Sequence, residues 1–203
     1  MSEMSRRQAL GVMASIPLAA ALRRLPPGLD AGAVEAASQA AEAALAAGPP
    51  YTPKFFTPHE WRTVRLLADL VIPRDERSGS ATEAGAPEFM DYILSEYPDQ
   101  QLRIRGGLAW LDAESLRRFG TRFVESGAPG QRALLDDVAW PARARPEMKP
   151  GAAFFSRFRD LVASGFWSSP VGIADLQYRG NTGMAEWTGC PPEALRKLGV
   201  SYG

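Results

Sequence analysis

The chain has 203 residues with 23 basic and 23 acidic side chains, so it lacks the basic excess typical of nucleic-acid-binding proteins. A hydrophobic fraction of 45% with 9% aromatic residues is typical of a globular protein. The chain has one cysteine, Cys190, and one histidine, His59. These counts exclude an internal disulfide, a Cys/His zinc site and a Cys-ligated iron–sulfur cluster. The sequence also contains no haem-attachment, dinucleotide-binding or P-loop motif.

The first 24 residues predict an export signal. Arg6 and Arg7 follow Ser5 and precede a weakly apolar run over 9–22, which is the pattern of a twin-arginine signal. Ala9 stands where a phenylalanine is common. The apolar run is shorter than the roughly 20 residues that a bilayer span needs. The twin-arginine translocase carries folded proteins to the periplasm, so the signal indicates a cofactor protein or the companion of one. An ordinary secretory signal or a mitochondrial presequence is the alternative.

Residues 25–54 are rich in Pro, Ala and Gly and are interpreted as a tether. Within them, 33–47 can form a helix by propensity, but the segment has few large apolar side chains to anchor it. Gly48-Pro49-Pro50 is the expected boundary to a folded domain at 55–203.

The first helix of that domain is predicted to begin at Thr57-Pro58-His59-Glu60, which offers a capping threonine, a proline at the first helical position and a glutamate at the third. Pro73 ends it. Its apolar side chains recur every three or four residues, which predicts a buried stripe. They are Trp61, Val64, Leu67, Ala68 and Val71.

Four more helices follow from the apolar periodicity, at about 87–97, 99–126, 131–139 and 152–165. Gly106-Gly107 lie within the third and cost about 1 kcal/mol each relative to Ala, so a close helix crossing or a kink is expected there. The expected buried stripe of that helix is Leu102, Leu108, Leu111, Leu116, Phe119 and Phe123. The fold class is therefore all-α: a small bundle of about five helices with a long irregular, aromatic C-terminal segment.

Most polar candidates for chemistry have an ordinary interpretation. His59 is expected to be solvated or locally hydrogen-bonded, because no motif supplies a nucleophile and an orienting acid. Neighbouring acids on a helix point in different directions, so the acid pairs are expected to be surface charges balanced by arginines. The pairs are Asp75/Glu76, Asp112/Glu114 and Asp136/Asp137.

The C-terminal segment is more informative. Cys190 follows Gly189 and precedes two prolines, and an unpaired cysteine in an exported protein suggests either an intersubunit disulfide or an inert buried thiol. Trp167, Tyr178 and Trp187 exceed what five short helices can easily bury, and such residues are favoured at protein interfaces. They are the candidate partner interface, with packing in the core as the alternative.

Several blocks, in this order, resemble the small third subunit of gluconate 2-dehydrogenases and the related small subunit of FAD-dependent glucose dehydrogenases. Together they cover about 55–190. They are Phe56-Thr57-Pro58, Leu67-Ala68-Asp69-Leu70-Val71-Ile72-Pro73-Arg74-Asp75, Glu83-Ala84-Gly85-Ala86-Pro87-Glu88-Phe89-Met90-Asp91, Gly107-Leu108-Ala109-Trp110-Leu111-Asp112, Arg118-Phe119-Gly120, Phe154-Phe155, Arg159-Asp160-Leu161 and Gly165-Phe166-Trp167-Ser168-Ser169-Pro170, then Gly172, Asp175-Leu176, Tyr178 and Gly180-Asn181. The Ala-rich segment 31–47 is a departure from the family pattern.

The resemblance implies a non-catalytic subunit of a periplasmic, membrane-associated dehydrogenase complex. Its expected partner is a large flavoprotein of the glucose-methanol-choline type that holds FAD and oxidises a sugar or polyol. A cytochrome c subunit with haem c often completes such complexes. The small subunit is expected to supply the export signal and to stabilise the flavoprotein. The family gives no catalytic, cofactor-binding or metal residues to carry over.

Two other functions stay open at this point. The chain could act alone as an exported hydrolase or lyase that uses its acidic residues. It could also be a ligand-binding or chaperone module that forms no permanent complex.

Overall fold

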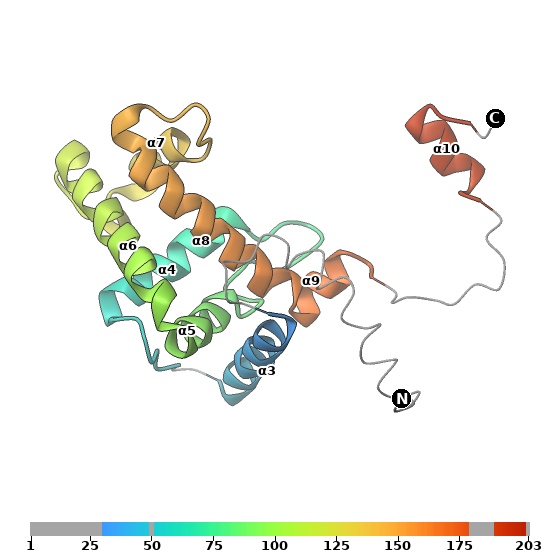
Figure 1. Ribbon diagram of the computed structural model, residues 1–203, viewed down its shortest axis with the longest axis horizontal. Coiled ribbons are helices and arrows are strands. Elements are labelled where there is room, and N and C mark those ends of the chain that lie inside the picture. The colour runs from blue at the N-terminus through green and yellow to red at the C-terminus, as the bar shows by residue number, and fades with distance from the viewer. Residues whose placement is uncertain (1–29, 49–50, 179–188, 202–203) are drawn as a thin grey trace, which may run out of the picture.

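The computed structural model describes residues 30–48, 51–178 and 189–201 (Figure 1). These residues form eight α-helices and two short 3₁₀ helices and contain no strand, which confirms the all-α class. The α-helices are α3 (Ala31–Ala47), α4 (Pro58–Val71), α5 (Ala86–Glu96), α6 (Pro98–Phe119), α7 (Gly127–Val138), α8 (Lys149–Trp167), α9 (Pro170–Asp175) and α10 (Pro192–Leu198). The 3₁₀ helices are η1 (Phe123–Glu125) and η2 (Pro146–Met148).

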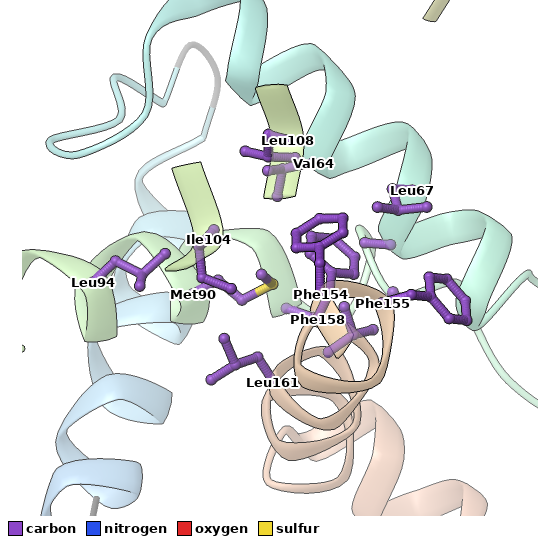
Figure 2. Close-up of a cluster of buried hydrophobic side chains, with 14 of the residues drawn as sticks. Val64, Leu67, Met90, Leu94, Ile104, Leu108, Phe154, Phe155, Phe158 and Leu161 are labelled. Carbon is purple, nitrogen blue, oxygen red and sulfur yellow. The ribbon is translucent and has the colours of Figure 1, made fainter. Parts of the chain in front are cut away.

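Helix α8 is the centre of the bundle, since it contacts α3, α4, α5, α6, α7 and α9. Its buried aromatic side chains meet aliphatic side chains from α4, α5 and α6, as Figure 2 shows. Full burial of a phenylalanine or leucine side chain contributes about 1.5–3 kcal/mol, so this cluster is the main source of stability. Its members include Val64, Leu67, Met90, Leu94, Ile104, Leu108, Phe154, Phe155, Phe158 and Leu161.

Helix α4 begins as its sequence predicts. The Thr57 hydroxyl accepts a hydrogen bond from the backbone N–H of Glu60, and the Glu60 carboxylate accepts one from the N–H of Thr57 at 2.8 Å. Pro58 occupies the first helical position. This capping box satisfies two backbone donors that a helix start otherwise leaves without partners.

The prediction for the third helix is wrong in two respects. Helix α6 ends at Phe119, because Gly120 adopts a left-handed conformation with φ of 74°, and Phe123 is buried in the separate turn η1. Leu102, Leu116 and Phe119 are exposed instead of buried. The buried residues of α6 include Ile104, Gly107, Leu108, Leu111 and Ser115.

A close helix crossing explains one of the two adjacent glycines in α6. A Cβ on Gly107 would lie 1.9 Å from the ring of Phe154 in α8. The contact is reciprocal, since a Cβ on Gly151 of α8 would lie 2.1 Å from the Trp110 ring of α6. Each helix therefore presents a glycine to an aromatic ring of the other. A Cβ on Gly106 would meet nothing within 4 Å.

The Ala-rich segment is a helix, as propensity predicts, but it packs closely instead of lacking an anchor. Helix α3 lies along α5 and buries Ala33, Val34, Ala37 and Ala41. Small side chains let the two helices approach closely, so large ones are not needed. Its N-terminus is capped by the Asp30 side chain. The boundary expected at 48–50 falls partly outside the described residues and stays a prediction.

The C-terminal segment is less irregular than expected, because it contains α9 and α10. Helix α9 follows α8 after a short turn, and its start is capped by the Ser169 hydroxyl, which accepts from the N–H of Gly172 at 3.1 Å. Helix α10 buries none of its residues. Across the described ranges, none of the helices has both the length and the apolar character needed to cross a bilayer.

Candidate partner interface

Helix α9 is held firmly against the end of α8. A Cβ on Gly172 would lie 2.1 Å from the carbonyl oxygen of Phe166, so only glycine permits this turn. At the other end of α9, the Arg77 guanidinium donates to the backbone oxygen of Asp175 at 2.8 Å and pairs with its carboxylate at 3.0 Å. These contacts fix a helix of fewer than two turns that would be unstable alone.

The outer side of α9 forms an open hollow of about 650 Å³. Among the residues that the structure describes, no charged side chain lines it, and the five that do line it are exposed. Leu176, next to the hollow, is 56% exposed. A site for a small molecule normally encloses most of its ligand, so an open, uncharged hollow fits a protein partner better. We call this surface the α9 hollow; its lining is Pro170, Ile173, Ala174, Gln177 and Tyr178.

The structure places two of the three predicted interface aromatics near this surface. Tyr178 is exposed and lines the α9 hollow. Trp167 is half-buried at the end of α8, with its ring edge-to-face on Phe166 at a centroid distance of 4.8 Å. Trp187 lies outside the described residues, so its part in an interface stays a prediction.

The other predicted functional residues lie apart from the α9 hollow in the sequence. Arg6 and Arg7 fall outside the described residues. Cys190 is exposed and lies two residues before α10, so its side chain is accessible for the intersubunit bridge that was predicted. The bridge itself stays a prediction.

His59 is hydrogen-bonded to an acid distant in the sequence and not to a local group, which differs from the expectation for it. Its Nε2 lies 2.5 Å from Asp112 Oδ2, and Asp112 Oδ1 accepts from the N–H of Phe123 at 3.1 Å. The pair therefore ties the start of α4 to α6 and η1. Asp112 faces His59 and not Glu114, so these two acids do not form a catalytic pair.

Glu114 differs from the expected surface charge because its side chain is almost completely buried. It accepts hydrogen bonds from Arg117 at 2.6 Å and from Arg118 at 2.5 Å, and Arg118 continues to Asp137. The hydrogen bonds from Arg117, followed by those from Arg118, lower the pKa of Glu114 to about 2. Glu114 therefore stays ionised inside an ion-pair network that joins α6 to α7.

A family model described as gluconate 2-dehydrogenase subunit 3 matches residues 58–184, well over half of the chain. The chain belongs to the gluconate 2-dehydrogenase subunit 3 family. No curated protein sequence and no solved structure matches the chain.

The family match covers the helical bundle from α4 to α9 and therefore includes the α9 hollow. Helix α3, Cys190 and α10 lie outside the matched range. The hollow is thus part of the subunit 3 domain, whereas the predicted disulfide residue is not.

Sequence reasoning missed the apolar side chains of α9. Ile173 and Leu176 are spaced by three residues after Ser169-Pro170, which is a helix start signal of the same kind as Thr57-Pro58. A search for short capped helices, and not only for sustained periodicity, could have found them.

Sequence reasoning also missed a buried carboxylate that organises the approach to α4. Asp91 is fully buried and accepts hydrogen bonds from the Tyr51 hydroxyl and from the backbone N–H groups of Lys54, Phe55 and Phe56 at 2.7–3.2 Å. Burial, followed by the hydrogen bond to Asp91, raises the pKa of Tyr51 above its usual value. Asp91 therefore fixes segment 51–56 on α5 and has a structural role.

Glu88, one turn before Asp91, is a second buried acid. Burial raises its pKa, and Arg65 at 3.3 Å is its ion-pair partner, while Oε2 has no hydrogen-bond partner within the described ranges. In the same part of the chain, no group of three or more His, Cys, Asp or Glu side chains is arranged to hold a metal ion.

Proposed function

We propose that this chain is a non-catalytic accessory subunit of a periplasmic FAD-dependent sugar or polyol dehydrogenase. In this proposal a large flavoprotein of the glucose-methanol-choline type binds FAD and performs the chemistry. The small subunit stabilises it and escorts it through the twin-arginine translocase. A cytochrome c subunit with haem c is the expected electron acceptor in complexes that contain one.

The α9 hollow is the observation that carries this proposal. Its lining is exposed and, among the described residues, uncharged, and it lies on a helix that is locked in place by Gly172 and by the Arg77–Asp175 ion pair. Apolar side chains that are exposed to solvent on a rigidly positioned helix are expected at the centre of a protein interface. The hollow also lies inside the part of the chain that defines the family.

Acid chemistry by this chain alone has less support. Asp112 is bound to His59, Glu114 to two arginines, and Asp137 to Arg118 and Arg145. Acids held in ion pairs with arginine stay ionised and are poorly suited to donate protons at a substrate, so Glu114 and Asp137 give little support to a hydrolase or lyase.

The interface is tested by co-purification of the full chain with a co-expressed large flavoprotein of the glucose-methanol-choline type. Ile173→Asp places a charge in the α9 hollow and is expected to reduce recovery of the flavoprotein at least tenfold. Trp140→Asp is the control, because Trp140 is an exposed aromatic residue that follows α7, and α7 lies at the far end of α8 from α9 (Figure 1). Equal recovery with the wild type and with Ile173→Asp would contradict the proposed interface.

The escort role is tested separately by replacing Arg6 and Arg7 with lysine. We expect both this chain and the flavoprotein to remain in the cytoplasm, as measured by fractionation and immunoblot. Arrival of the flavoprotein in the periplasm would contradict the role.

The covalent link is tested by a non-reducing gel of the purified complex. We expect a band that contains both chains and disappears on reduction and in the Cys190→Ser variant. A band that Cys190→Ser leaves unchanged would exclude the bridge.

A further inference from the structure

A closed circuit of side-chain contacts joins α4, α5 and the segment that leads into α4. The Tyr51 hydroxyl of that segment donates to Asp91 of α5 at 2.9 Å, and the Tyr51 ring centroid lies 5.3 Å from that of Trp61 in α4. The Arg65 guanidinium lies 5.8 Å from the Trp61 ring centroid and pairs with Glu88 of α5 at 3.3 Å. Glu88 and Asp91 are three residues apart on one helix, so they are neighbours and close the circuit.

The segment 51–56, which we call the strap, is held mainly by one of these acids. The Asp91 carboxylate accepts from the backbone N–H groups of Lys54, Phe55 and Phe56 at 2.7–3.2 Å, in addition to the Tyr51 hydroxyl. Arg105 of α6 adds one contact, since it donates to the backbone oxygen of Phe55 at 2.8 Å. The closed strap buries the Phe56 side chain.

The second acid of the circuit is incompletely satisfied. Glu88 is only 4% exposed, and its Oε1 pairs with Arg65. Its Oε2 has no hydrogen-bond partner within the described residues. Because a buried, ionised carboxylate is costly unless both oxygens have donors, the site accommodates Glu88 better with a proton than without one.

The groups around Glu88 act mostly in the same direction. Burial is the main cause that raises the pKa of Glu88 above its usual 4.5, and the charge of Asp91 raises it further, whereas its own backbone N–H and Arg65 lower it. Tyr51 of the strap lies within range of the Glu88 charge, so displacement of the strap admits water beside Glu88. Helices α3, α6 and α8 also pack against α5, but none of them forms an ion pair with Glu88 in the described part of the chain.

We propose that Glu88 is a pH-sensitive latch for the strap. While Glu88 carries its proton, it is neutral and the strap stays closed on α5. When Glu88 ionises, its unpartnered oxygen and the neighbouring Asp91 carboxylate favour an open state in which water reaches both acids. The strap then leaves α5 and exposes Phe56. The inference concerns this chain alone and does not rest on the proposed function.

The direction of the pH effect follows from the two states of Glu88. In the open state the side chain is in water with its usual pKa of 4.5, whereas in the closed state its pKa is higher. Below pH 4.5 Glu88 is protonated in both states, so closure is most stable there. As the pH rises from 4.5 through the higher pKa of the closed state, the open state releases the proton first and closure loses stability.

Tryptic cleavage after Lys54 in the purified full chain measures the opening, because cleavage requires the local backbone to leave its hydrogen bonds. The ratio of the wild-type rate to the Glu88→Gln rate at each pH removes the pH dependence of trypsin itself. His59 is present in both chains, so its protonation affects both rates alike. We expect this ratio to rise at least threefold from pH 5 to pH 8.

Glu96→Gln is the matched control, since Glu96 is an exposed glutamate on the same helix. The ratio of the wild-type rate to the Glu96→Gln rate should not change with pH. Glu88→Met is a second uncharged replacement of similar length, and it should give the same result as Glu88→Gln. Circular dichroism of each variant checks that it has the helix content of the wild type.

Asp91→Asn tests whether the cleavage reports on the strap. It weakens the acceptor of four hydrogen bonds, so we expect cleavage after Lys54 at least tenfold faster than in the wild type at every pH. Unchanged cleavage in this variant would show that Asp91 does not hold the strap and would overturn the proposal. Ratios for Glu88→Gln and Glu88→Met that stay constant from pH 5 to pH 8 would overturn it as well, because another group would then cause any pH dependence.

Discussion

The two faces of helix α6 carry the same kinds of residues in opposite environments. Gly107 and Leu108 are buried against α8, where the Phe154 ring leaves no room for a Cβ on Gly107. Gly106 and Leu102 lie on the outer face, where neither contributes to the core. The inner residues are explained by folding. Folding does not explain the outer ones, and single substitutions can separate the two faces.

The largest difference is expected between two leucines of this helix. Leu108→Ala should lower the free energy of unfolding by about 3 kcal/mol, because it removes buried methyl groups and leaves a cavity. Leu102→Ala should change it by less than about 0.5 kcal/mol, because its side chain is in water. Urea unfolding followed by circular dichroism measures both. Equal effects would contradict the assignment of the two faces.

The two adjacent glycines give the next largest difference. Gly107→Ala should destabilise the chain by about 2 kcal/mol, because the new methyl group would force Phe154 and α8 away. The same unfolding measurement applies. A stable Gly107→Ala variant would show that the close crossing of α6 and α8 is not required.

Glu114 tests the ion-pair network on the inner side of α6. Its pKa falls from the usual 4.5 to about 2 on folding, so its contribution to stability is complete above pH 4.5 and is lost as the pH falls towards 2. Glu114→Gln should therefore cost about 1.5 kcal/mol at pH 7. The difference from the wild type should shrink between pH 4.5 and pH 2.5. A difference that does not depend on pH would exclude the charge as its cause.

The smallest effect is expected at Gly106, and it has the opposite sign. Gly106→Ala should raise the free energy of unfolding by up to about 1 kcal/mol, because alanine restricts the unfolded chain and no atom obstructs its Cβ. Destabilisation by this substitution would show that the fold, and not a partner, requires the glycine.

The sequence predicts those parts of the fold whose signals are local. The cap at Thr57 and the period of α4 need only neighbouring residues, and both are confirmed. The inner and outer faces of α6 could not be assigned, because leucines occur on both and only the position of α8 decides which are buried. Helix α3 was underestimated for a similar reason, since alanines stabilise a helix pair only when a close neighbour such as α5 is present.

The candidate interface was predicted only in part. Tyr178 was singled out by residue type, and it lines the α9 hollow. Ile173 and Leu176 were missed because a helix of fewer than two turns carries too short a period to be recognised. The four hydrogen bonds to Asp91 could not be predicted from the sequence either, because they join segments that are more than 30 residues apart.

Size-exclusion chromatography with light scattering tests the central claim most directly, applied to the wild-type chain co-expressed with a large flavoprotein of the glucose-methanol-choline type. The account predicts one species that contains both chains, in which the flavin absorbance belongs to the large chain. Elution of this chain alone at its own mass, with the flavin in a separate peak, would contradict it.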